Sequence, residues 1–259
     1  ISAWAISWSV VQKKGVFFFG SNTQACTIDN CFVGSCNNLN GDCTGISIQD
    51  AKSITMINCS SLSHTAATGY NCYGIKIENS TNCNCTNVVS NNNTGDSAIG
   101  FLLKNSKNCT LSECAANNNT GIVTEGIGFQ LINAHSNLIE DCYSFSNIGK
   151  TDGIGVQLID ASTCNSIIKT TASLQTSSLT GNGQGFSCMG GFRNFFTACH
   201  AFGNKGGSSV LSKGCGAMFQ SETTTTIADS SFDCNDGGTG TGYGLCFNFV
   251  TNCIVKACT

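Results

Sequence analysis

Apolar and polar positions alternate over short stretches that recur along the chain, each led by a glycine. Examples are Gly45-Ile-Ser-Ile48, Gly128-Phe-Gln-Leu131 and Gly244-Leu-Cys-Phe247. The leading glycines, 26 to 31 residues apart, are Gly15, Gly45, Gly74, Gly100, Gly128, Gly155, Gly185, Gly216 and Gly244. Alternation predicts β-strands. A repeat of this length predicts a solenoid whose coils bury their apolar faces by stacking on one another.

Two further apolar pairs follow in each repeat, so each coil is predicted to have three short strands and three corners. The corner five residues after the glycine carries Asp or Asn in five consecutive repeats: Asp50, Asn79, Asn105, Asn133 and Asp160. These residues tolerate left-handed backbone angles, and their stacked amides can bond from coil to coil. Runs such as Asn93-Thr94-Gly95 and Asn119-Thr120-Gly121 predict turns at another corner.

The consensus G-[IFV]-x-[IL]-x-[ND]-[SA]-x-x-[NC]-x-[ILM]-x-x-C resembles a known repeat. It is similar to that of right-handed parallel β-helices of the pectate-lyase-like superfamily, especially the NosD-like class, with Cys where many members carry Asn. The resemblance covers residues 15–259 and implies an all-β, right-handed parallel β-helix of about nine coils of about 28 residues. The superfamily is understood to include polysaccharide lyases, hydrolases, tailspikes and adhesins, so the resemblance specifies fold more than function.

The uninterrupted repeat predicts one β-helix domain over residues 15–259, with residues 1–14 as a partial coil or cap that includes Trp4 and Trp8. The chain starts at Ile1 and stops fifteen residues into its ninth repeat, and we expect it to be part of a longer polypeptide. Proline is absent, which suits a fold built on ladder hydrogen bonds.

Charge and hydropathy exclude some classes of partner. Charged residues make up 10% of the chain and the net charge is −3, which disfavours a nucleic-acid partner. There is no apolar run of 18 residues, so no membrane-spanning helix is expected. The sequence names no compartment, although a cell-surface, extracellular or virion setting is favoured.

Nineteen cysteines fall mostly at positions that the alternation directs inward. We expect them to be buried, mostly reduced core residues, because a thiol is a small hydrophobe. The predicted ladder is Cys31, Cys59, Cys114, Cys142, Cys199 and Cys258. Scattered disulfides between coils are the alternative. A structural zinc site is disfavoured because no C-x-x-C pair occurs, so no metal is predicted.

Two groups of acidic residues are candidate catalytic sites. Asp96, Glu125 and Asp152 lie three or four residues before a leading glycine in successive repeats, and we expect them to stack. The second group is Glu113, Glu140 and Asp141. Stacked carboxylates suit glycoside hydrolysis, and a lyase of this fold would add Ca²⁺. Two features argue against a catalytic role for either group. Neither group has an Arg or His beside it, and the short corners are expected to give no walls for a cleft.

The preferred hypothesis is a non-catalytic structural or adhesive rod of a surface, fibre or virion-appendage protein. The alternative is a polysaccharide lyase or glycoside hydrolase that acts through Asp96, Glu125 and Asp152, with Ca²⁺ as a cofactor only for the lyase. Ice binding is disfavoured because the column Thr55, Asn84, Thr110, Leu138 is irregular. The expected partners are other domains or copies bound end to end near Trp4, Trp8 and Phe247–Phe249, with carbohydrate as a further candidate.

Overall fold

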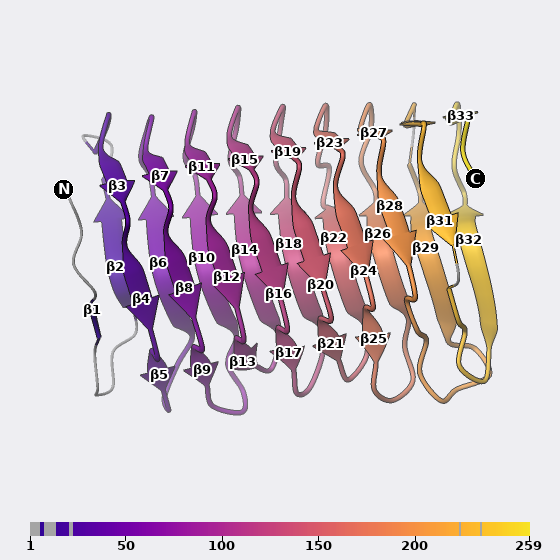
Figure 1. The fold of residues 1–259 in the computed structure, drawn as a ribbon, viewed down its shortest axis with the longest axis horizontal. Helices are drawn as coiled ribbons and strands as arrows, with labels where there is room; N and C mark the ends of the chain where they lie inside the picture. The colour runs from indigo at the N-terminus through magenta and orange to yellow at the C-terminus, as the bar shows by residue number, and fades with distance from the viewer. Residues whose placement is uncertain (1–5, 8–13, 21–22, 223, 234) are drawn as a thin grey trace.

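The chain folds into a solenoid of parallel strands in a computed structural model that describes residues 6–7, 14–20, 23–222, 224–233 and 235–259. Figure 1 shows the coils stacked from the N-terminus to the C-terminus along one axis. Each of the three main sheets has nine strands, and the chain makes about eight turns between them. The predicted all-β solenoid of parallel strands is therefore confirmed, with a small difference in how coils are counted.

The first face of the coil is the long sheet, whose central strands have seven residues. It contains β2 (Lys14–Phe19), β6 (Cys43–Gln49), β10 (Cys72–Glu78), β14 (Ala98–Lys104), β18 (Gly126–Ile132), β22 (Gly153–Ile159), β26 (Gly183–Met189), β29 (Lys213–Gln220) and β32 (Thr241–Asn248). The second sheet contains β3 (Thr27–Asp29), β7 (Thr55–Ile57), β11 (Asn84–Thr86), β15 (Thr110–Ser112), β19 (Leu138–Glu140), β23 (Ser166–Ile168), β27 (Phe195–Thr197), β30 (Thr226–Ala228) and β33 (Ile254–Lys256).

The third sheet completes the predicted set of three, and a smaller corner sheet adds a fourth. The third sheet contains β1 (Ile6–Ser7), β4 (Phe32–Gly34), β8 (Ser60–Leu62), β12 (Val89–Asn91), β16 (Ala115–Asn117), β20 (Tyr143–Phe145), β24 (Thr171–Ser173), β28 (His200–Phe202) and β31 (Ser231–Asp233). The corner sheet contains β5 (Asn37–Asn38), β9 (Thr65–Ala66), β13 (Thr94–Gly95), β17 (Thr120–Gly121), β21 (Ile148–Gly149) and β25 (Thr176–Ser177).

Residues 1–14 lie largely outside the described residues, including Trp4 and Trp8. Strand β1 pairs with β4 through Ile6 and Val33. Within the described part of the chain, no helix is long and apolar enough to span a membrane.

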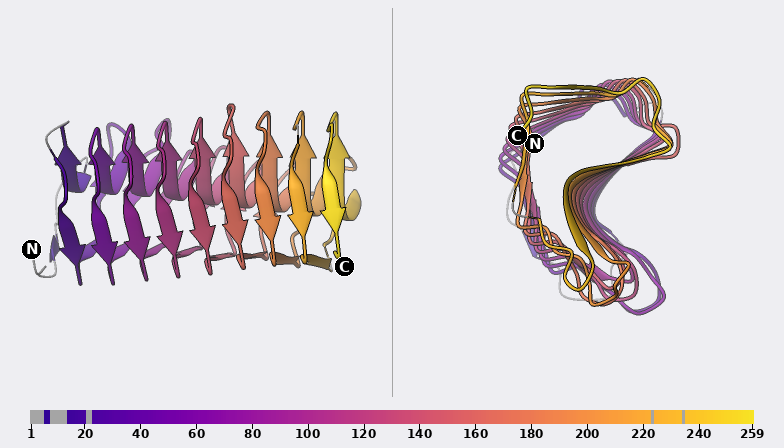
Figure 2. Two further views of the ribbon diagram at one scale, coloured as in Figure 1. Left: turned by 90° about the horizontal axis from the view of Figure 1, so that it is seen from above. Right: turned by 90° about the vertical axis from the view of Figure 1, so that its right-hand side faces the viewer.

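The leading glycines draw the long sheet against the third sheet. A Cβ on Gly128 would lie 2.0 Å from Ser144 Oγ and 2.6 Å from the carbonyl oxygen of Gly155, so only glycine fits. Alternation breaks here, because Gly128 and Phe129 both face the interior whereas Gln130 faces outward. The resulting waist appears in Figure 2 as an indentation on one side of the cross-section. The outer surface of the long sheet is therefore concave.

The Asp/Asn positions lie at one corner of each of five consecutive coils. Asp50, Asn79, Asn105, Asn133 and Asp160 all have left-handed φ angles, between 47° and 52°. The Asn79 amide donates to Asp50 Oδ1 over 3.1 Å, and the Asn105 amide donates to Asn79 Oδ1 over 3.0 Å. The Asn133 amide donates to Asn105 Oδ1 over 3.0 Å. A side-chain ladder thus joins consecutive coils along this corner.

A second amide ladder lies inside the solenoid, where the sequence predicted only turns. Asn93 Nδ2 donates to Asn119 Oδ1 over 2.7 Å, and Asn119 Nδ2 donates to Asn147 Oδ1 over 2.8 Å. We call this series the inner amide ladder: Asn93, Asn119, Asn147, Gln175, Asn204 and Asn235. Its first five side chains are fully buried. The prediction of turns did not foresee this buried ladder, in which Asn119 Oδ1 and Asn147 Oδ1 also accept the backbone N–H of the ladder residue in the preceding coil.

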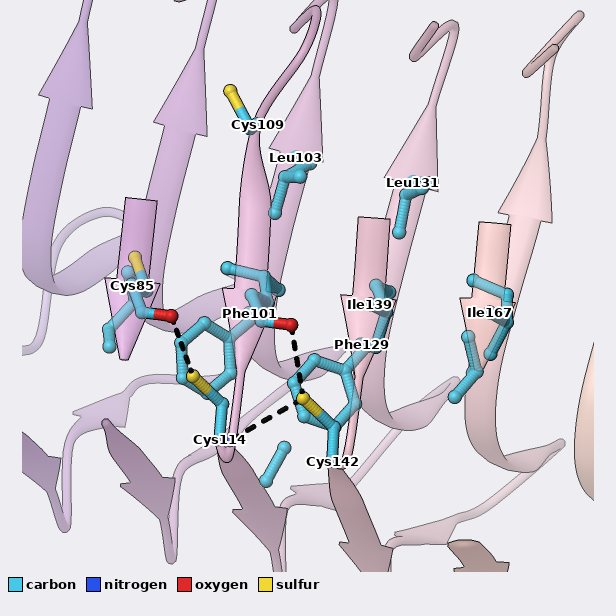
Figure 3. Close-up of a cluster of buried hydrophobic side chains, with 14 of the residues drawn as sticks. Cys85, Phe101, Leu103, Cys109, Cys114, Phe129, Leu131, Ile139, Cys142 and Ile167 are labelled. Carbon is cyan, nitrogen blue, oxygen red and sulfur yellow. Dashed lines mark hydrogen bonds between the residues drawn. The ribbon is translucent and has the colours of Figure 1, made fainter. Parts of the chain in front are cut away.

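Cysteines fill the core beside stacked aromatic rings. The rings of Phe101 and Phe129 stack with centroids 5.1 Å apart. Figure 3 shows Cys114 and Cys142 next to these rings, and the Cys114 thiol donates to the carbonyl of Cys85 over 3.5 Å. The Cys114 N–H donates to Cys142 Sγ over 3.4 Å. The ladder positions therefore stack coil on coil as small apolar residues with weak donors.

The predicted cysteine ladder is buried except at its last member. Cys31, Cys59, Cys114, Cys142 and Cys199 are buried, whereas Cys258 is half-buried because it lies in the last coil. Phe247 pairs in register with buried Phe219 and stacks on its ring with centroids 5.5 Å apart, and it is 43% exposed because it too lies in the last coil. The redox state of the ladder in solution remains a prediction.

Candidate functional site

The concave face of the long sheet carries a cavity lined by polar and charged side chains. Its outward side chains form columns that run along the solenoid, one residue per coil. The first half carries an outer apolar cluster of Ile99, Leu102 and Ile127, which extends to Ile154 at the edge of the second half. Lys76 and Lys104 flank this half and pair with Glu78 over 2.7 Å and 3.4 Å.

The second half of the concave face is hollowed into a cavity of about 310 Å³. We call it the groove. Its lining combines two carboxyl groups, one ammonium group, carboxamides and thioethers. The residues are Glu125, Asp152, Ile154, Gln157, Asn182, Gln184, Met189, Leu211, Lys213, Met218, Gln220, Cys246 and Asn248. The expectation that the solenoid offers no cleft is therefore wrong, because the inward bend of the sheet supplies the walls that the short corners do not.

Glu125 and Asp152 lie at equivalent positions on adjacent coils. Each immediately precedes a long strand, and the paired residues Gly126 and Gly153 set the register. Asp152 Oδ1 accepts the backbone N–H of Asn182 over 2.7 Å, which fixes that carboxyl at the start of the next coil. Glu125 accepts instead from the side chain of Gln157. The two carboxyl groups therefore share one end of the groove with different hydrogen-bond partners.

Both carboxyl groups are harder to ionise than in water. Burial raises the pKa of Glu125, and the nearby charge of Asp152 raises it further, while the hydrogen bond from Gln157 partly offsets both. Burial also raises the pKa of Asp152, against the lowering effect of the Asn182 N–H. Glu125 therefore has the stronger tendency to hold a proton, and Asp152 has a backbone donor that favours its anion.

Carboxamides line the floor beyond the two acids. Gln130 Nε2 donates to Gln157 Oε1 over 2.6 Å. Gln184 is 4% exposed, and its Oε1 has no hydrogen-bond partner among the described residues. A buried acceptor without a partner costs free energy of roughly 1–3 kcal/mol. A ligand hydroxyl that donates to Gln184 would remove that cost.

Lys213 brings a positive charge to the same groove. The backbone N–H of Lys213 donates to Asn182 Oδ1 over 2.9 Å. The Nζ atom of Lys213 lies 5.7 Å from the centre of the Tyr243 ring. No Arg or His was expected beside the acids, and the sequence did not identify this lysine as a member of the site. Leu211, which is 82% exposed, and half-buried Met189 add apolar surface to the groove.

The third acid of the predicted cluster does not line the groove. Ser97, rather than Asp96, occupies the column of Glu125, because Ala98 pairs with Gly126. Asp96 Oδ2 instead accepts the backbone N–H of Gly69 over 2.8 Å. The one-residue difference in its distance from the leading glycine accounts for the shift.

The second predicted acidic group lies on other corners and outside the groove. Glu113 is exposed, while Glu140 and Asp141 are half-buried. Glu113 and Asp141 have left-handed φ angles of 54° and 50°, as turn residues do. The sequence also missed Gln157, Asn182 and Gln184. These three residues could have been recognised in the sequence, because they are polar residues on or beside strands in which most other positions are apolar.

Comparisons with known proteins concern the fold. No protein-family model and no curated protein matches the chain. Among solved structures it is similar to pectate lyase Pel9A, with a TM-score of 0.44 and 15% identity, covering 90% of this chain and 70% of that one. It is also similar to the A-module of the Azotobacter vinelandii mannuronan C-5 epimerase AlgE6, with a TM-score of 0.40 and 9% identity, covering 85% and 71%.

A viral protein shows a similar likeness. ORF18 of Geobacillus virus E2 has a TM-score of 0.40 and 10% identity, covering 90% of this chain and 55% of that one. At such identities a likeness describes the course of the backbone, and function has to be argued from the site.

Proposed function

We propose that the chain is a carbohydrate-active β-helix whose groove binds a neutral polysaccharide and hydrolyses it through Glu125 and Asp152. One observation carries the proposal. Two partly buried carboxyl groups on adjacent coils share the end of a 310 Å³ groove lined by carboxamides, including the unpartnered Gln184 Oε1. Carboxamides suit sugar hydroxyls, because each both donates and accepts.

The groove favours a neutral chain over an acidic one. Glu125 and Asp152 place two carboxyl groups where a uronate would bind, and Lys213 is the single cation in the lining. A chain of uronates would meet repulsion that one ammonium group does not balance. A neutral glycan avoids this cost and can use Met189 and Met218 as apolar surface for its ring faces.

The roles follow from the two environments. Glu125 serves as the proton donor to the glycosidic oxygen, because burial and its neighbour favour its protonated form. Asp152, held by the Asn182 N–H, attacks the anomeric carbon as the bond to the protonated glycosidic oxygen breaks. Water, deprotonated by Glu125, then hydrolyses the sugar–Asp152 ester and frees the carboxylate. Adjacent parallel strands lie about 4.8 Å apart. Because the two carboxyl groups project from backbones at that spacing, we infer a retaining arrangement, with carboxyl groups roughly 5–5.5 Å apart, over an inverting one with roughly 6.5–9.5 Å between them.

The test is a panel of neutral and acidic polysaccharides incubated with the protein, with and without Ca²⁺. New reducing ends are measured together with absorbance from unsaturated products. We expect reducing ends from a neutral glycan without unsaturated products, and loss of that signal in the Glu125→Gln/Asp152→Asn double variant. Unsaturated products that require Ca²⁺, or activity that survives the double variant, would contradict the hydrolase proposal.

A non-catalytic rod is the second candidate, and exposed aromatics on the third sheet favour it. Tyr143, Phe145 and Phe202 are 56%, 38% and 43% exposed on β20 and β28. Such side chains suit contact with another protein surface. A folded protein that neither cleaves nor binds any glycan of the panel would favour this candidate, with other domains or copies of the chain as its partners.

A further inference from the structure

The lobe beside the corner sheet departs from the repeat in its first coils. Later coils carry the inner amide ladder at this position, beginning with Asn93. The two preceding coils carry Cys36 and His64 there instead. The equivalence is structural, because the Cys36 N–H donates to His64 Nδ1 over 3.0 Å, as the Asn93 N–H donates to Asn119 Oδ1 over 3.3 Å. Two residues that can ligate metals thus replace two carboxamides.

A second column departs from the repeat at the same place. Cys43 pairs in register with Cys72, and the following coils have Ala98, Gly126 and Gly153 at this position. The Cys43 thiol donates to the carbonyl of Cys36 over 3.2 Å and also contacts the thiol of Cys72. Two thiols and one imidazole therefore meet where later coils have small residues and amides, and the Cys72 thiol lies beside Cys43.

The ligand atoms of Cys36, Cys43 and His64 lie within 4.8 Å of one another, and all three residues are buried. In a tetrahedral zinc site, bonds of about 2.3 Å to sulfur and about 2.0–2.1 Å to nitrogen place the ligand atoms roughly 3.5–3.8 Å apart. Contraction by about 1 Å would bring these side chains to that geometry. Among the described residues, this is the single group of three or more such side chains close enough to hold an ion.

The hydrogen bonds of His64 fix the tautomer that a metal ligand needs. The Ser61 hydroxyl donates to the carbonyl of Gly74 over 2.7 Å, so its oxygen accepts from His64 Nε2, 2.8 Å away. The ring proton is therefore on Nε2, and Nδ1 presents its lone pair towards Cys36. A histidine ligand whose second nitrogen donates to a fixed neighbour is the usual arrangement in metal sites. Burial also lowers the pKa of His64 to about 4, which keeps the ring neutral.

We propose that Cys36, Cys43, Cys72 and His64 bind one zinc ion and clamp the first coils of the solenoid together. Binding releases the three thiol protons and gives three thiolate bonds and one bond from Nδ1. It also replaces the hydrogen bond between the Cys36 N–H and Nδ1. The sequence pattern predicted no metal because these four residues have no C-x-x-C spacing, and the ladder brings them together only in three dimensions.

The test begins with reduced protein stripped of metal by a chelator and titrated with Co²⁺ and then Zn²⁺. We expect one equivalent of Co²⁺ to give thiolate-to-metal charge-transfer absorbance, one equivalent of Zn²⁺ to remove it, and Zn²⁺ to raise the Tm. Two conservative variants introduce the residue that a later coil carries at the equivalent position. His64→Asn introduces the residue type of Asn93, and Cys43→Ala introduces that of Ala98. Each should weaken Co²⁺ binding by more than the roughly 10–100-fold that loss of an outer-shell partner costs.

Cys142→Ala is the matched control, because Cys142 is an equally buried thiol stacked on Cys114 with no imidazole in the group. It should leave the stoichiometry and the absorbance unchanged. The proposal is overturned if the unmodified protein gives no charge-transfer band and no shift in Tm. It is also overturned if His64→Asn and Cys43→Ala bind Co²⁺ as tightly as the unmodified chain. Neither outcome bears on the groove, which lies on other coils.

Discussion

Glu125→Gln is expected to lower cleavage of the polysaccharide by about 10²–10⁴-fold, the range that one general acid contributes. The fold should survive, because glutamine has nearly the same shape and can keep the contact with Gln157. Initial rates from reducing-end assays, with circular dichroism as the check on folding, measure this effect. Glu113→Gln, an exposed corner change outside the groove, is the matched control and should keep full activity.

The dependence of the cleavage rate on pH should also reflect the protonation states of Glu125 and Asp152. Cleavage requires Glu125 protonated and Asp152 ionised, so activity falls as the pH rises through the pKa of Glu125 and as it drops through that of Asp152. Both pKa values are raised, which moves the active range above the roughly 3.9–4.3 of carboxyl groups in water. A Glu125→Gln variant with an unchanged rate or an unchanged alkaline limb would remove Glu125 from the proposed role.

Gly128→Ala is expected to destabilise the protein by more than about 4 kcal/mol, the range reached only when a core cannot relax. The new Cβ would lie 2.0 Å from Ser144 Oγ and 2.6 Å from the Gly155 carbonyl oxygen, and the second contact is with backbone. Urea unfolding followed by circular dichroism measures the change. If the backbone at the waist could move to accommodate the new Cβ, the free energy of unfolding would fall by less than about 1 kcal/mol, which would contradict this prediction.

Adding Ser144→Ala to Gly128→Ala separates the two contacts. The double variant removes the hydroxyl that the new Cβ would strike, while the contacts with the Gly155 carbonyl oxygen at 2.6 Å and with the Cβ of residue 144 at 2.9 Å remain. We therefore expect only partial recovery of stability. Full recovery would show that the backbone contact costs nothing and that the waist does not depend on glycine.

The solenoid could be predicted from the chain because its determinants are local and repeated. The leading glycines and the long strands recur at the same place in each coil, and the corner series that includes Asn79 and Asn105 recurs in five consecutive coils. The inner amide ladder could not be predicted in the same way. Asn93 and Asn119 precede Thr-Gly, and asparagine is equally at home in an exposed turn and in a buried amide stack.

The groove depends on contacts between distant residues, which the alternation of one strand does not report. The waist arises where Gly128 meets Ser144 and Gly155, and the concavity follows from that contact. Asp96 lies four residues before its leading glycine and Glu125 lies three before its own, and only Glu125 lies in the groove. The thiol and imidazole group was hidden for a similar reason, since Cys36 and His64 become neighbours only through coil stacking.

The most direct measurement of the central claim is a crystal structure of the Glu125→Gln variant with an oligosaccharide of the polysaccharide that the protein cleaves. The account predicts sugar density in the groove, with a hydroxyl donating to Gln184 Oε1 and the scissile oxygen facing residue 125. An oligosaccharide bound on another face, with the groove left unoccupied, would contradict it.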